Sequence, residues 1–306
     1  MNSSGLTDIP LYSTFKKVKL IKKGMSGDKK YYIETDEKKH LLLRISDISK
    51  YEQKKLEYEL MNKLIEIDVP MPKTVDFGIC NANKSVYTLL QWIDGKEVEE
   101  IIPTMDDNRQ YLLGYESGKI LKLIHSLKSR ADITEWSTRY FSVIDERINA
   151  FYREGVSFEG SEKILAFLET NKYLLYNRPQ CYHHGDYHMG NLINSANDEL
   201  LVIDWHTVDF DNFGDPWYEF NRIGIEYPAF ASGQIDGYFE NNPPEDFWML
   251  LAYYLSASAI TSIVWAKYFA PNEMDSILQL NNNILVWFDG MDNPIPTWYR
   301  SISDKK

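Results

Sequence analysis

Cysteine is scarce in this chain, since only Cys80 and Cys181 occur among its 306 residues. Two cysteines are too few for a disulfide framework, so a reducing compartment, the cytoplasm, is the expected location. Basic charge is also scarce, because 33 Lys and Arg residues are outnumbered by 45 Asp and Glu residues, for a formal net charge of −12. Nucleic acid is therefore not an expected partner, because phosphate backbones require concentrated Lys and Arg. An acidic chain favours a cationic ligand.

The chain has no internal repeat, no low-complexity stretch and little that suggests a membrane. Residues 1–8 contain no basic segment leading into an apolar one, so we do not expect a secretory signal. Residues 247–266 carry no charged side chain and are long enough to span a bilayer. Several Ser, Thr and Tyr residues interrupt that stretch, however, and Asp246 and Lys267 bracket it. We therefore expect a helix buried in a helical domain, with no membrane partner.

The N-terminal third alternates apolar and polar residues in short runs separated by polar turns, which is typical of strands. The expected strands are residues 15–21, 31–35, 40–45, 73–77 and 85–91. Between the third and fourth of these, leucines and isoleucines at helical spacing predict a helix that ends near Asp68, before Pro70. Glycines and Ser26 in the first turn would let backbone N–H groups approach phosphate oxygens, although an ordinary hairpin explains the same turn.

The chemistry of the chain is concentrated in residues 182–194, Tyr-His-His-Gly-Asp-Tyr-His-Met-Gly-Asn-Leu-Ile-Asn. His184, Asp186 and Asn191 have the His-x-Asp-x-x-x-x-Asn spacing of a phosphotransfer loop, and Asp204 ends the apolar run that follows. Phosphoryl transfer needs a carboxylate that orients and deprotonates the attacking hydroxyl, and oxygen ligands for magnesium. A turn at residues 194–198 predicts a hairpin that brings Asn191 and Asp204 together.

Two simpler interpretations of this stretch remain open. The spacing alone is loose, and His183, His184 and His188 could instead indicate a zinc site. No cysteine lies at finger-like spacing, which favours the kinase interpretation.

From residue 104 onward the spacing of apolar residues becomes that of helices. The expected fold is α+β: residues 1–92 form an antiparallel sheet with one helix, and residues 93–306 form a larger, mainly helical lobe.

In order and spacing, these features resemble those of the aminoglycoside phosphotransferases and the wider choline-kinase-like group. The matching pieces are Gly24-Met25-Ser26, Leu43-Arg44, Glu57, residues 123–127, residues 184–191, Ile203-Asp204-Trp205 and Gly214-Asp215-Pro216. The resemblance implies a two-lobed, protein-kinase-like fold, ATP or GTP with Mg²⁺, and Asp186 as the catalytic base. It also implies that Asn191 and Asp204 are metal ligands, that Arg44 is paired with Glu57 over the phosphates, and that His184 and Asp215 give structural support. The other expected nucleotide contacts are Ser26, Gly27 and the stretch Gln91, Trp92 and Ile93.

The expected acceptor is a small cationic molecule, an aminoglycoside such as kanamycin, because a polycation requires carboxylates around its site. The candidate carboxylates are Asp209, Asp211, Glu219 and Glu226 downstream of the loop, and Asp94, Glu97, Glu99 and Glu100 near the lobe boundary. A choline, homoserine or sugar type of acceptor is the alternative, with a cation cage formed by aromatic residues. The rings available for it are Trp205, Trp217, Tyr218, Tyr227 and Trp265. A catalytically silent nucleotide-binding protein is the third interpretation, and the sequence carries no signal for an oligomeric state.

Overall fold

The computed structural model describes two compact units. The described residues are 5–22, 27–129, 132–205, 212–223 and 226–300. The N-terminal unit consists of Met1–Pro103 together with Met189–Thr207, and the C-terminal unit consists of Thr104–His188 and Val208–Lys306. The first division therefore lies after Pro103, eleven residues beyond the expected end at residue 92, and a later segment returns to the N-terminal unit.

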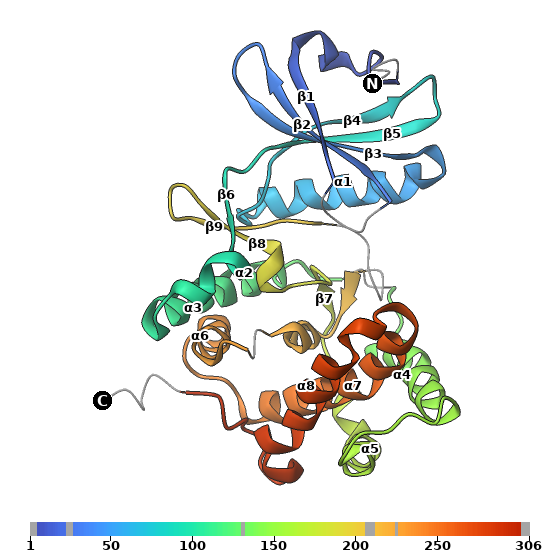
Figure 1. The fold of residues 1–306 in the computed structure, drawn as a ribbon, viewed down its shortest axis with the longest axis vertical. Helices are drawn as coiled ribbons and strands as arrows, with labels where there is room; N and C mark the ends of the chain where they lie inside the picture. Colours follow the sequence, from blue (N-terminus) through green and yellow to red (C-terminus); the bar gives the residue numbers. More distant parts are fainter. Residues whose placement is uncertain (1–4, 23–26, 130–131, 206–211, 224–225, 301–306) are drawn as a thin grey trace. The chain divides into compact units, whose positions relative to one another are not determined.

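The N-terminal unit contains a five-stranded antiparallel sheet in the order β1-β2-β3-β5-β4 (Figure 1). Its strands are β1 (Phe15–Ile21), β2 (Lys29–Thr35), β3 (His40–Asp47), β4 (Thr74–Cys80) and β5 (Ser85–Gln91). All five strands expected from the sequence are present, with ends shifted by a few residues. The expected α+β class with an N-terminal antiparallel sheet is thus confirmed.

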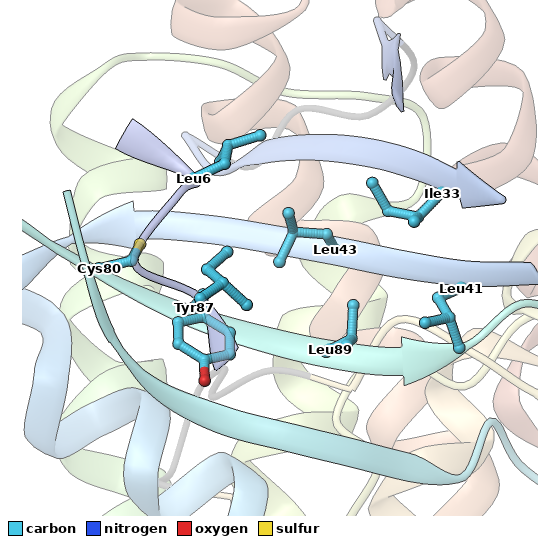
Figure 2. Packing of buried hydrophobic residues seen from close by; sticks show 8 residues of the cluster. Leu6, Ile33, Leu41, Leu43, Cys80, Tyr87 and Leu89 are labelled. Atoms are coloured by element: carbon cyan, nitrogen blue, oxygen red, sulfur yellow. The ribbon is translucent and has the colours of Figure 1, made fainter. Parts of the chain in front are cut away.

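Side chains of β3 alternate between the two faces of the sheet, as the period of two in a strand requires. Leu41 and Leu43 join a buried cluster on one face, which Figure 2 shows. The cluster also contains Leu6 and Ile9, from the segment before β1, so residues that carried no strand signal complete this core. Arg44 lies next to Leu43 and consequently belongs to the opposite face.

Helix α1 (Tyr51–Glu66) packs against β4 and β5. Met61 and Leu64 are its buried apolar residues, and the helix ends shortly before Val69-Pro70. The helix ends there because proline lacks an N–H group and restricts the backbone of the residue before it.

A second, three-stranded sheet in the same unit has the order β6-β8-β9. Its strands are β6 (Gly95–Glu97), β8 (Leu192–Ser195) and β9 (Leu200–Val202). The β8–β9 pair is the hairpin expected between Asn191 and Asp204, with Leu192 opposite Val202. Because β6 pairs with β8, residues beyond 92 belong to the N-terminal unit, which explains the shifted division.

The C-terminal unit is mainly helical (Figure 1). Its longer elements are α3 (Asp107–Ile124), α4 (Trp136–Arg153), α5 (Ser161–Thr170), η8 (Pro216–Arg222), α6 (Pro228–Phe239), α7 (Glu245–Phe269) and α8 (Met274–Trp287), with a short pair of strands β7 (Cys181–Tyr182) and β10 (Phe213–Gly214). Within the described ranges, α7 alone is long and apolar enough to cross a membrane, but 72% of its apolar window is buried among the other elements.

Helices α3 and α6 approach each other with backbone against backbone. A Cβ atom added at Gly118 of α3 would overlap the carbonyl oxygen of Gln234, and one added at Gly237 of α6 would overlap the carbonyl oxygen of Tyr115. Residues without side chains are therefore required at this crossing, which fixes α3 and α6 as one rigid pair.

Candidate functional site

Arg44 extends from β3 into a cluster of charged side chains within the N-terminal unit. Its Nη2 lies 3.0 Å from Asp28 Oδ2, and its Nη1 lies 3.5 Å from the carbonyl oxygen of Trp205. Arg44 and Trp205 also line a small cavity together with Lys54, Glu57 and four other residues of the unit. The side chain of Arg44 is only 10% exposed, so its guanidinium group is held in one place by these acceptors.

Asp28 is the central acceptor of this cluster. Its side chain is 2% exposed and accepts a hydrogen bond from Ser46 Oγ at 2.6 Å, while Lys54 Nζ lies 3.2 Å away. Burial raises the pKa of Asp28, but the hydrogen bond from Ser46 and the charges of Lys54 and Arg44 outweigh it and lower the pKa to about 2. Asp28 is therefore ionised at neutral pH and joins the end of the first turn to β3 and α1.

Arg44 and Glu57 line the same cavity, and the contacts described for them run to other residues. Glu57 Oε2 instead lies 2.9 Å from Lys54 Nζ, one helical turn earlier on α1, and Lys54 contacts Asp28. The link from the β3 cation to α1 thus runs through Asp28 and Lys54. Positive and negative side chains alternate along this link, so each buried cation has a carboxylate beside it that offsets its charge.

Asp204 lies at the end of the β8–β9 hairpin and contacts two cations. Its Oδ1 is 3.6 Å from Arg44 Nη1 and 3.8 Å from Lys30 Nζ. Its backbone has a φ of 62°, a conformation that is uncommon for a residue other than glycine and is often found at functional sites. The hairpin backbone joins Asp204 to Asn191, because the N–H group of Ile203 donates to the carbonyl oxygen of Asn191 at 2.9 Å.

Asn191 and Asp204 fit a magnesium site better than a zinc site. They offer amide and carboxylate oxygens, which Mg²⁺ prefers, and the carboxylate of Asp204 is about one-third exposed. Magnesium in kinases is held by one or two such residues together with phosphate oxygens, so a larger protein ligand set is not required. Across the part of the chain that the structure describes, no group of three or more His, Cys, Asp or Glu side chains could hold a metal ion, so the zinc interpretation has no support there.

In the C-terminal unit, the loop that carries Asp186 is held by Glu219. The two carboxylate oxygens of Glu219 accept the backbone N–H groups of His184 at 2.8 Å and Gly185 at 2.6 Å. Gly185 has a φ of 87°, a left-handed conformation that glycine adopts without strain. Consecutive N–H groups captured by one carboxylate fix the direction in which the chain enters Asp186.

The sequence suggested that Glu219 binds the acceptor, but the structure does not support this role. Its carboxylate is only 2% exposed and is already bound by the loop and by His125. Burial raises the pKa of Glu219, but the hydrogen bond from His125 and the neighbouring imidazoles of His183 and His125 lower it to about 2. The carboxylate is thus ionised and acts as a fixed acceptor. Glu219 is a positioning residue for the loop.

Asp186 itself remains accessible, with a side chain that is 31% exposed. Its carboxylate lies 3.4 Å from His188 Nε2, and its backbone N–H group donates to His184 Nδ1 at 3.3 Å. His184 is fully buried, which agrees with its expected role as support for the loop. Asp186 is therefore a partly exposed carboxylate on a loop whose preceding backbone is held by buried groups.

Asp215 supports the loop from the start of η8. Its carboxylate accepts two hydrogen bonds from Arg178, at 2.7 and 3.0 Å, and one from Tyr254 at 2.7 Å. Its backbone carbonyl lies 2.9 Å from His183 Nε2, next to the catalytic loop. Asp215 thus contacts Arg178, Tyr254 and His183, whereas the N–H groups of His184 and Gly185 are bound by Glu219.

The remaining predicted site residues lie in different surroundings. The N–H groups of Gln91 and Trp92 donate to Lys73 and His40 within the sheet, so a base bound at this stretch would use their carbonyls or the N–H group of Ile93. Gly27 and Glu226 are exposed. Ser26, Asp209 and Asp211 lie outside the described residues.

The aromatic cage expected for the alternative acceptor is not formed by Trp217 and Tyr218. Trp217 packs on Phe247 and under the guanidinium group of Arg178, and Tyr218 packs on Trp136 and Tyr254. Both rings are half-buried and packed against these neighbouring side chains.

The sheet unit, the helical unit and the residues of the two loops define a phosphotransferase of the kinase-like fold class. The sequence model of the phosphotransferase enzyme family matches residues 17–254. The chain therefore belongs to this family, as the resemblance in sequence predicted. No curated protein sequence matches the chain.

Solved structures similar to this chain have the same fold at low sequence identity. A choline/ethanolamine kinase family protein from Mesorhizobium loti has a TM-score of 0.64 and 12% identity, with 94% of this chain and 95% of that chain covered. The ADP-bound aminoglycoside phosphotransferase APH(2'')-Ib has a TM-score of 0.57 and 16% identity, with 90% and 99% covered. A fructosamine-3-kinase homologue from Haemophilus somnus has a TM-score of 0.58 and 16% identity, with 89% and 92% covered.

Proposed function

We propose that this protein is a small-molecule kinase that transfers the γ-phosphoryl group of ATP or GTP to a hydroxyl group of an aminoglycoside such as kanamycin. The observation that carries the proposal is the loop geometry. Asp186 is partly exposed on a loop whose preceding N–H groups are bound by Glu219, in a chain of the phosphotransferase family. A positioned carboxylate beside an accessible surface is what an acceptor hydroxyl requires.

In this mechanism Asp186 accepts the proton of the acceptor hydroxyl as the oxygen attacks the γ-phosphorus atom. A bond forms between that oxygen and phosphorus, the bond from phosphorus to the β,γ-bridging oxygen breaks, and the nucleoside diphosphate leaves. Arg44 binds phosphate oxygens and offsets their charge. Asn191 and Asp204 would hold Mg²⁺, which would neutralise phosphate charge when bound.

The choice of an aminoglycoside rests on the acidity of the chain and on the packing of the Trp217 and Tyr218 rings against other side chains. Among the candidate carboxylates downstream of the loop that the structure describes, Glu226 is the exposed one. A cationic antibiotic with several hydroxyl groups fits such a surface better than a quaternary ammonium ligand, which needs aromatic faces.

The test is the release of nucleoside diphosphate by the purified protein with kanamycin and related aminoglycosides, beside choline, homoserine and sugars. Turnover with an aminoglycoside, abolished in Asp186→Asn, supports the proposal. Turnover restricted to the metabolites would transfer the assignment to the alternative acceptor. Nucleotide binding without turnover on any acceptor would indicate the catalytically silent protein.

A further inference from the structure

We propose that Lys30 is a second phosphate-binding residue of the nucleotide site, beside Arg44, that binds the β- and γ-phosphate oxygens directly. This proposal rests on the proposed function, because it assigns a residue to the same nucleotide. Lys30 is on β2 and lies opposite Arg44 in the register of the β2–β3 pair. Residues directly opposite each other in an antiparallel pair extend from the same face of the sheet, so both cations are on one surface.

The two cations share one carboxylate oxygen. Asp204 Oδ1 is 3.8 Å from Lys30 Nζ and 3.6 Å from Arg44 Nη1. The Lys30 side chain is only 17% exposed, unlike an ordinary surface lysine, whose ammonium group extends into water. A mostly buried ammonium group directed at the expected metal ligand is therefore already in the place where phosphate oxygens would be bound.

Two N–H donors of Arg44 are already engaged within the protein. Its Nη2 is bound by Asp28 and its Nη1 is directed at the carbonyl oxygen of Trp205. Lys30, by contrast, has Asp204 as its only ionic partner among the residues that the structure describes. An ammonium group has three N–H donors, so at least two remain for phosphate oxygens.

Charge balance leads to the same assignment. Three cations, Lys30, Arg44 and Lys54, are matched by three carboxylates, Asp28, Glu57 and Asp204. The cations contact one another's carboxylates, so the set is neutral without a ligand. If Asp204 turns to a magnesium ion, Lys30 loses its described counter-charge, and a phosphate oxygen is the anion that replaces it. The ammonium group of Lys30 would thus exchange its contact with Asp204 for a contact with phosphate oxygens as the nucleotide binds.

The experiment compares the wild-type protein with Lys30→Met and Lys29→Met by calorimetric titration. The probes are β,γ-imido-ATP and adenosine, or the corresponding guanine pair if the wild-type protein binds those. Lys29 is the matched control, because it is the preceding residue of β2 and is exposed. We expect Lys30→Met to weaken binding of the triphosphate analogue about tenfold, since a charge-assisted contact is lost, and to leave adenosine binding and the melting temperature unchanged. Lys30→Arg should retain most of the affinity.

Equal affinity of wild type and Lys30→Met for the triphosphate analogue would overturn the assignment. So would a parallel loss of adenosine binding, which would show that Lys30 supports the shape of the site and does not bind phosphate. A wild-type protein that binds neither nucleotide series would overturn the proposed function as well, so the two failures are distinguishable.

Discussion

The carboxylate of Asp28 lies 3.0 Å from the guanidinium group of Arg44, and both side chains are almost fully buried. Asp28 follows the first turn of the sheet, whereas Arg44 is on β3, so this pair fixes the end of the turn against the strand that carries the phosphate-binding cation. Lys54 extends the pair to α1. Preorganisation of the cation is the functional consequence, since an arginine held by a carboxylate needs little reordering when an anion binds.

Asp28→Asn should therefore destabilise the protein by about 2 to 3 kcal/mol at neutral pH, because two mostly buried cations lose their shared counter-charge. The pKa of Asp28 is lowered when the protein folds, so its contribution to stability is present above pH 3.8 and is lost as the pH falls toward about 2. Urea denaturation across this range should show a shallower acid dependence in the variant. Asp36→Asn, at an exposed turn residue, is the control; an equal loss there would contradict the prediction.

Glu219→Gln should lower kcat by about tenfold or more, with little change in the KM of the acceptor, because a misplaced loop carboxylate affects the reacting geometry. The neutral amide has one acceptor oxygen in place of two, so one of the N–H groups of His184 and Gly185 loses its partner. Glu226→Gln is the comparison. If exposed Glu226 binds a polycation, its variant raises the acceptor KM and leaves kcat nearly unchanged. A raised acceptor KM in Glu219→Gln alone would restore the original expectation for that residue.

The strands, the helix after β3 and the Asn191–Asp204 hairpin could be predicted from the sequence, because each depends on local pattern. Alternation predicts strands, and Val69-Pro70 predicts the end of α1. The division between the units could not be predicted from the sequence. It depends on β6, which pairs with a strand almost a hundred residues later, and no local signal specifies that partner. The role of Leu6 in the sheet core was missed for the same reason.

Prediction of the site failed where partners are chosen in three dimensions. Arg44 was correctly placed on the third strand, but Glu57 was assigned to it and Asp28 was overlooked. Asp28-Lys29-Lys30 reads as an ordinary charged turn, and only the fold shows that Asp28 and Lys30 extend into the site while Lys29 is exposed. Glu219 is a candidate acceptor carboxylate from the sequence alone, because acidic residues are rarely buried unless they are paired and its partner His125 is distant in sequence.

Gly118→Ala should destabilise the C-terminal unit by about 1 to 3 kcal/mol, because overpacking at the α3–α6 crossing exceeds the gain in helix propensity. The new methyl group would overlap the carbonyl oxygen of Gln234, which is backbone and cannot move without shifting α6. Thermal denaturation measures the effect. Leu112→Ala, at a side chain of α3 that is 59% exposed, is the control and should change the melting temperature far less.

His183 should be neutral at neutral pH and carry its proton on Nε2, because the carbonyl oxygen of Asp215, 2.9 Å away, can only accept a hydrogen bond. Burial lowers the pKa of His183 to about 4, whereas the unfolded chain titrates near 6.5. The unfolded state therefore binds the proton first, and the contribution of His183 to stability is lost as the pH falls from 6.5 toward about 4. Nitrogen chemical shifts of the imidazole ring report both the tautomer and the titration. An Nδ1–H tautomer, or a titration midpoint near 6.5, would show that the ring does not hold the Asp215 carbonyl beside the catalytic loop.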